Sequence, residues 1–160
     1  MKLSRIWTPI GLAAALLLAI PFGAQAQPLR RTITAPSYNY IGIGGGDDGF
    51  SVNSKFSISN GLSIRPEVAT DFDFDDDEDV SYLVPITYDF SVGQGRATFN
   101  PYVGAGVSGT IGEDSDVDFA TVAGVDYRFA NNYVANGSID YAPFADDDEV
   151  GFNLGVGYLF

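Results

Sequence analysis

The end of the chain alternates regularly between large apolar side chains and small or polar ones. Every second position is large and apolar, at Val150, Phe152, Leu154, Val156, Tyr158 and Phe160. The positions between them are small or polar, except Leu159. Because successive side chains of a β-strand point to opposite faces, this alternation predicts a strand with one apolar face.

The same period of two recurs upstream and predicts eight strands. They lie near residues 38–46, 49–58, 62–73, 80–90, 97–109, 117–129, 133–143 and 149–160. A strand tilted by about 45° needs roughly 9–11 residues to cross a bilayer, and each segment is that long. No stretch after residue 26 approaches the roughly 18 consecutive apolar residues of a transmembrane helix.

The connections between these strands differ in charge according to their order. Those after the first, third, fifth and seventh strands are acidic, whereas those after the second, fourth and sixth carry no acidic residue. In an up-and-down barrel, odd connections share one end and even connections the other, so one rim is predicted to be strongly negative. At residues 59–61, matching of the strand faces predicts a three-residue turn that pairs Ile58 with Leu62, rather than a two-residue turn.

The polar face of the predicted strands carries a nearly balanced set of charges. The charged residues expected to form a polar network in the lumen are Lys55, Arg65, Glu67, Asp89, Asp126, Arg128 and Asp140. Such a balance suits a closed lumen, because buried charges must be paired. Lys55 is expected to lie within reach of Glu67 on the next strand. The alternative is the outer face of a soluble barrel, which usually has more Lys and Glu.

Aromatic residues on the apolar face are sorted by height. Near the end without acids lie Phe56, Tyr88, Phe90, Phe99, Tyr127, Phe129, Tyr133, Tyr158 and Phe160. Near the acidic end lie Phe50, Phe72, Phe74, Tyr82, Phe119, Tyr141 and Phe152. Two aromatic girdles around an aliphatic band are typical of a barrel that spans a membrane.

The N-terminus has the pattern of a cleaved secretory signal peptide. Lys2 and Arg5 make the start positive, and an apolar run follows. Ala24 and Ala26 then provide the small residues of a cleavage site before Gln27. The alternative, a single membrane anchor, is disfavoured because the apolar run is short.

The barrel region resembles small eight-stranded outer-membrane β-barrels of the OmpA/OmpX type. The resemblance is carried by the signal peptide, the alternating strands, the short turns at one end and the terminal Tyr158-Leu159-Phe160. It implies that the barrel assembly machinery reads Phe160, that both termini are periplasmic and that the acidic connections face outward. We therefore expect a signal peptide at 1–26, a flexible periplasmic lead-in at 27–37 and an outer-membrane barrel at 38–160.

Composition argues against several functions. The chain has no Cys and no His, which removes thiol chemistry, disulfides and His-based acid–base catalysis. A formal net charge of −13 opposes binding to nucleic acid. Asp89, Asp126 and Asp140 fall on different strands, and nothing in the sequence brings any two together. We expect no enzyme activity and no cofactor.

The predicted function is a structural or surface-interaction role in the outer membrane. It includes envelope integrity, adhesion or contact with an extracellular ligand through the acidic connections, beside the lipid bilayer and lipopolysaccharide. The first alternative is a narrow cation-preferring pore, with space left by the lumen glycines Gly42, Gly44, Gly104, Gly106, Gly124, Gly155 and Gly157. The second is a soluble periplasmic lipid-binding barrel.

One acidic connection carries candidate ligands for a divalent cation. The candidates are Asp75, Asp76, Asp77, Glu78 and Asp79. The preceding Asp-x-Asp-x-Asp spacing starts like a calcium loop, but Asp76 stands where glycine is needed and Tyr82 where the closing Glu belongs. A solvated acidic rim is the alternative reading.

Overall fold

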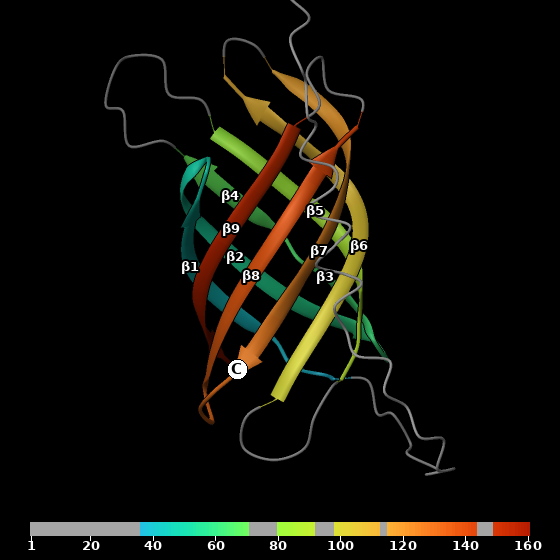
Figure 1. Cartoon of the computed structure of the whole chain (residues 1–160), viewed down its shortest axis with the longest axis vertical. Coiled ribbons are helices and arrows are strands. Elements are labelled where there is room, and N and C mark those ends of the chain that lie inside the picture. The colour runs from blue at the N-terminus through green and yellow to red at the C-terminus, as the bar shows by residue number, and fades with distance from the viewer. Residues whose placement is uncertain (1–35, 71–79, 92–97, 113–114, 144–148) are drawn as a thin grey trace, which may run out of the picture. The chain divides into compact units, whose positions relative to one another are not determined.

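The strands form one antiparallel sheet that closes on itself (Figure 1). The computed structural model describes residues 36–70, 80–91, 98–112, 115–143 and 149–160. β1 pairs with both β2 and β9, so the sheet closes between its first and last strands. Within the described residues, no helix is long and apolar enough to cross a membrane.

The strands follow the chain order around the barrel. They are β1 (Tyr40–Gly46), β2 (Gly49–Ser59), β3 (Leu62–Ile64), β4 (Glu67–Thr70), β5 (Val80–Asp89), β6 (Thr98–Ile111), β7 (Asp116–Arg128), β8 (Tyr133–Ala142) and β9 (Glu149–Leu159). β3 and β4 both lie between β2 and β5, so they form one interrupted strand. The predicted eight-stranded antiparallel barrel is confirmed.

The interruption between β3 and β4 falls at Arg65 and Pro66. Proline has no amide hydrogen to donate, so regular pairing stops there. The neighbouring strands still hold both residues: Arg65 N donates to Pro85 O at 3.1 Å, and Ser54 N donates to Pro66 O at 3.0 Å. The break therefore changes the local ladder without opening the barrel.

The turn between β2 and β3 differs from the predicted one. Ser59 pairs with Leu62, which leaves a two-residue Asn60-Gly61 turn, and the register shifts between Ser57 and Ser59. The predicted three-residue turn and the pairing of Ile58 with Leu62 are wrong. The shift at Ile58 is a β-bulge, which adds one residue and keeps Ile58 and Leu62 both exposed on the outer face. Gly61 has a φ of 79°, in the left-handed region that favours glycine.

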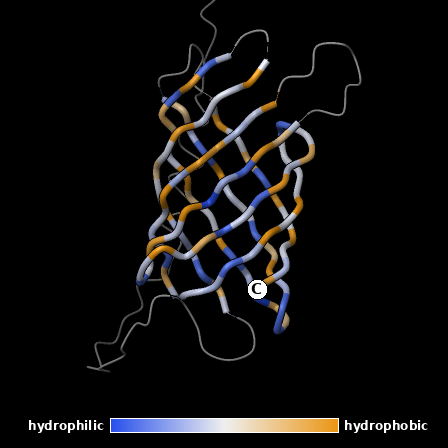
Figure 2. The backbone as a smooth tube through the Cα atoms, turned by 180° about the vertical axis from the view of Figure 1, so that it is seen from behind, coloured by the Kyte–Doolittle hydropathy of each residue, from blue (hydrophilic) through white to orange (hydrophobic). Residues whose placement is uncertain are grey.

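The outer face of the barrel is apolar and the inner face is polar or small. Along β9, Val156 is 51% exposed while Asn153 is 5% exposed. The hydropathy of the backbone alternates along the strands in the same way (Figure 2). Leu159, which interrupts the apolar alternation, points inward and packs with Tyr40 and Val134.

Aromatic rings form a belt around one end of the barrel. We call this the turn end, because it carries the Asn60-Gly61 turn; the opposite end, at Asp47 and Asp48, is the acidic end. The belt contacts run from β6 to β9, with centroid distances of 4.6 Å for Phe99–Tyr127, 6.2 Å for Tyr127–Phe129, 6.3 Å for Phe129–Tyr133 and 5.7 Å for Tyr133–Tyr158. At the acidic end, Phe119, Tyr141 and Phe152 are exposed outward, whereas Phe72 and Phe74 lie outside the described residues.

A positive charge on the middle of the outer face should block insertion. We expect Val156→Arg to destabilise the folded barrel by about 2–4 kcal/mol, because its side chain would face lipid near the midplane. The measurement is the free energy of unfolding by urea in lipid vesicles. Val156→Ile is the control for size, and Val150→Arg, nearer the acidic end, should cost only about 0–1 kcal/mol. Equal costs for the two arginine variants would contradict the assigned membrane depth.

Candidate functional site

Four charged side chains meet inside the barrel, and we call them the ionic cluster. Lys55 comes from β2, Arg65 from the break between β3 and β4, Asp89 from the end of β5 and Asp126 from β7. The Lys55, Asp89 and Asp126 side chains have no exposed surface, and that of Arg65 is 6% exposed. The alternation of each strand turns these residues inward, and the closed sheet brings them together.

Arg65 holds the ionic cluster together. Its Nη1 and Nη2 donate to the two carboxylate oxygens of Asp126 at 3.1 and 2.8 Å. Nη2 also donates to Asp89 Oδ1 at 2.9 Å, and Nε donates to Thr87 Oγ1 at 3.1 Å. The planar guanidinium suits this arrangement, because the fixed positions of its N–H groups match those of the two oxygens of a carboxylate.

Lys55 completes the charge balance of the ionic cluster. Its Nζ lies 3.1 Å from Asp89 Oδ2 and 4.0 Å from Asp126 Oδ2. Two positive and two negative charges therefore share the interior, as a buried set requires. The expected partner of Lys55 was Glu67, but Glu67 instead accepts a hydrogen bond from the side chain of Asn153.

Three tyrosines that the sequence reasoning missed surround the ionic cluster. The guanidinium carbon of Arg65 lies 3.5 Å from the ring centroid of Tyr102, and Nη1 donates to the Tyr40 hydroxyl at 3.3 Å. The Tyr38 hydroxyl donates to Asp126 Oδ2 at 2.5 Å. The signal was present in the sequence, since all three occupy inward positions of their alternating segments.

Tyr38 lies just before β1, at the turn end of the lumen. Lys55 Nζ lies 3.4 Å from its ring centroid, a cation–π contact. Its backbone N and O both bond to Ser57 Oγ, at 3.2 and 3.0 Å. Burial, with the nearby Asp126 carboxylate, raises the pKa of the Tyr38 hydroxyl well above its ordinary value. The hydroxyl is therefore a neutral donor.

The other predicted lumen residues lie apart from the ionic cluster. Arg128 lies near the turn end, with its guanidinium carbon 5.1 Å from the Tyr38 ring centroid. Glu67 and Asp140 line a cavity at the acidic end. The divalent-cation candidates Asp75, Asp76, Asp77, Glu78 and Asp79 lie outside the described residues.

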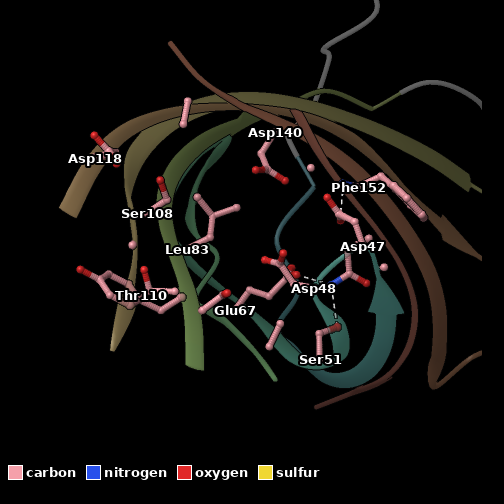
Figure 3. A pocket seen from close by; sticks show the side chains of 18 of the residues that line it. Asp47, Asp48, Ser51, Glu67, Leu83, Ser108, Thr110, Asp118, Asp140 and Phe152 are labelled. Carbon is pink, nitrogen blue, oxygen red and sulfur yellow. Dashed lines mark hydrogen bonds between the residues drawn. The ribbon is translucent and has the colours of Figure 1, made fainter. Parts of the chain in front are cut away.

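The cavity at the acidic end has a volume of about 570 Å³, and we call it the acidic cavity. Figure 3 shows labelled carboxylates that reach it from separate elements. Its lining includes six acidic residues, Asp47, Asp48, Glu67, Asp116, Asp118 and Asp140. Among the described residues that line it, none is Lys or Arg. The cavity is therefore strongly negative, in contrast to the neutral ionic cluster.

The lumen glycines are packed against neighbouring atoms. A Cβ atom at any of them would come closer than 3.0 Å to another atom; they are Gly42, Gly44, Gly104, Gly106, Gly124, Gly155 and Gly157. At Gly124 the nearest atoms would be Gly137 O at 2.4 Å and the Tyr102 ring at 2.5 Å. These glycines allow close approach of neighbouring strands and rings instead of leaving open space.

The carboxylates of Asp89 and Asp126 both accept hydrogen bonds from Arg65. The sequence did not indicate that these two residues would come together. Both are engaged by cations and by hydroxyl donors, including Ser63 for Asp89 and Tyr38 for Asp126. A general base needs a carboxylate that is free to take a proton from substrate. Within the described part of the chain, no group of three or more acidic side chains is arranged to hold a metal ion.

Several solved membrane barrels are similar to this one. A de novo designed transmembrane β-barrel has 16% identity and a TM-score of 0.58, over 78% of this chain and 97% of that chain. The N-terminal β-barrel domain of Pseudomonas aeruginosa OprF has 14% identity and a TM-score of 0.56, over 79% and 99%. The Yersinia pestis outer membrane protein Ail in a phospholipid bilayer nanodisc has 18% identity and a TM-score of 0.51, over 78% and 100%. At these identities, the likeness shows the fold alone.

Sequence comparison supplies the family. None of the curated protein sequences matches this chain. The model of the outer membrane protein beta-barrel domain family matches residues 10–160, nearly the whole length. The closed sheet, the apolar outer face and the polar interior are the features expected of such a domain. The chain belongs to the outer membrane protein beta-barrel domain family.

Proposed function

We propose that this protein is a non-conducting structural barrel that contributes to envelope integrity or surface contact through its acidic end. The observation that carries this proposal is the ionic cluster, which occupies part of the interior with four buried side chains joined by ion pairs. An eight-stranded barrel has an interior just wide enough for side chains to fill. The packed lumen glycines further support a closed interior.

We also propose how the chain is exported and how the barrel is oriented in the outer membrane. Residues 1–26 act as a cleaved signal peptide, and residues 27–37 form a periplasmic lead-in to the barrel. Both termini lie in the periplasm, so the acidic end faces outside the cell beside lipopolysaccharide. The assembly machinery reads Phe160, which lies on the outer face next to Phe56 with ring centroids 6.4 Å apart.

The proposal also assigns no catalytic role to the lumen. A catalytic carboxylate must be accessible and free to exchange a proton. Asp89 and Asp126 are enclosed, and each forms ion pairs with Lys55 and Arg65. The arrangement fits a structural role in which the four charges stabilise one another.

Purified protein in a planar lipid bilayer should show no steady single-channel conductance. We expect the ionic cluster and Tyr38 to block a continuous water path through the lumen. Removal of the Tyr38 ring by Tyr38→Ala should leave Arg65 in place. We therefore expect both proteins to stay closed under an applied voltage. Steady cation-selective openings of the unmodified protein would overturn the proposal in favour of a narrow pore.

Neutralising Lys55 should destabilise the barrel. We expect Lys55→Met to lower the free energy of unfolding by about 3–5 kcal/mol, because it leaves an unbalanced buried negative charge. The measurement is urea unfolding in lipid vesicles. The double variant Lys55→Met with Asp89→Asn keeps the cluster neutral and should recover part of the loss. A double variant less stable than the single one would contradict charge balance as the cause.

Labelling of single cysteines tests the orientation, since the chain has no Cys of its own. Asp48 and Asn131 are both exposed, at the acidic end and the turn end respectively. In intact cells, a maleimide that cannot cross the outer membrane should label Asp48→Cys and not Asn131→Cys. Permeabilised cells should label both. The opposite pattern in intact cells would mean that the barrel is inserted the other way round.

A further inference from the structure

We propose that Asn60 is a site of covalent modification, at which the side-chain amide is lost by spontaneous reaction with the next backbone nitrogen. The chain contains the dipeptide Asn-Gly at Asn60-Gly61 and again at Asn136-Gly137. Glycine after asparagine favours this reaction, because no Cβ hinders the approach of its nitrogen to the asparagine side chain. The fold separates the two sites, since one forms a turn and the other lies within a strand. The modification does not depend on the proposed function.

The Asn60-Gly61 site lies outside the β ladder. β2 ends at Ser59 and β3 begins at Leu62, so the two residues form the unpaired centre of the turn. The Asn60 side chain is exposed to solvent. Gly61 is itself buried, and its carbonyl accepts a hydrogen bond from Asp89 N at 2.7 Å. The peptide between Asn60 and Gly61 can therefore change conformation without breaking the pairing of the strands.

The Asn136-Gly137 site is held in the sheet on both sides. Gly137 lies opposite Val125 on β7 and opposite Leu154 on β9. Asn136 Nδ2 also donates to Asn53 Oδ1 at 3.2 Å. The reaction requires the asparagine to leave the extended conformation of a strand, which would break backbone hydrogen bonds of β8. The sheet therefore protects Asn136.

The reaction needs no reagent other than water. The Gly61 nitrogen loses its proton to solvent base and forms a bond with Asn60 Cγ. The Cγ–Nδ2 bond then breaks, and the nitrogen leaves as ammonia with a proton from water. Water opens the resulting succinimide ring at either of its carbonyls, which leaves aspartate or isoaspartate at position 60. In isoaspartate the backbone runs through the side chain and is longer by a methylene group.

The modification changes both the charge and the length of the turn. Either product adds a carboxylate to a connection that carries no acidic residue. The length of the turn, together with the bulge at Ile58, sets the pairing of Ser59 with Leu62. Isoaspartate lengthens the turn and so disfavours this pairing, whereas aspartate leaves the backbone unchanged. We therefore expect isoaspartate to destabilise the barrel more than aspartate does.

The test is mass spectrometry of the full chain, folded in nanodiscs and stored in mildly alkaline buffer. Exchange of an amide for a carboxyl group raises the mass, and fragmentation locates the residue that has reacted. We expect Asn60 to react about a hundredfold or more faster than Asn136, because a central strand opens rarely. Asn131 is also exposed but is followed by Asn132, so it should stay unmodified. In urea, Asn60 and Asn136 should react at similar rates, and Asn60 should react faster than in the barrel, where Gly61 is buried.

The matched controls are two variants of position 60. Asn60→Gln should show no mass increase, because glutamine would have to close a larger ring. Asn60→Asp adds the charge without lengthening the backbone, and should unfold in lipid vesicles at a higher urea concentration than the isoaspartate product. Equal rates at Asn60 and Asn136 in the folded barrel would contradict the proposal. So would an unmodified Asn60 after the time in which the unfolded chain has reacted.

Discussion

Backbone hydrogen bonding is the constraint on which the rest of this structure depends. The hydrocarbon layer offers no water to unpaired N–H and C=O groups, so a sheet that crosses it must close. The pairing of β1 with β9 achieves this closure. Even where Pro66 cannot donate, its carbonyl accepts from Ser54 of the adjacent strand. Once the ladder is closed, each strand must turn alternate side chains to lipid and to the lumen.

The charged residues of the interior differ between the ionic cluster and the acidic end. Deep in the lumen, away from water, Lys55 and Arg65 match Asp89 and Asp126 one for one. Toward the acidic end lies a cavity whose described lining includes Glu67 and Asp140 and no Lys or Arg. The barrel thus combines a neutral ionic cluster, which favours stability, with an acidic end.

The fold could be predicted from the sequence because alternation is a local property of each segment. Residues 150–160 show their two faces without reference to any partner, and the charges of the connections sort the ends. The partners of the lumen side chains could not be predicted, because they depend on how all the strands are shifted relative to one another around the barrel. Despite the bulge at Ile58, Asn53 lies opposite Glu67, as the predicted register of these strands requires. Lys55 nevertheless meets Asp89 on β5 instead of Glu67, and Tyr38 joins a cluster that no neighbouring residue indicates.

The position of Tyr38 has a consequence for the order of assembly. Its hydroxyl bonds to Asp126, which lies 88 residues later in the chain. The adjacent Asn39 accepts a hydrogen bond from Phe160 N at 3.1 Å. Both contacts need the last strands to have come round to the first. The residues before β1 therefore make these contacts only after β1 has paired with β9. A partly assembled sheet lacks both hydrogen bonds, and this distinguishes it from the finished barrel.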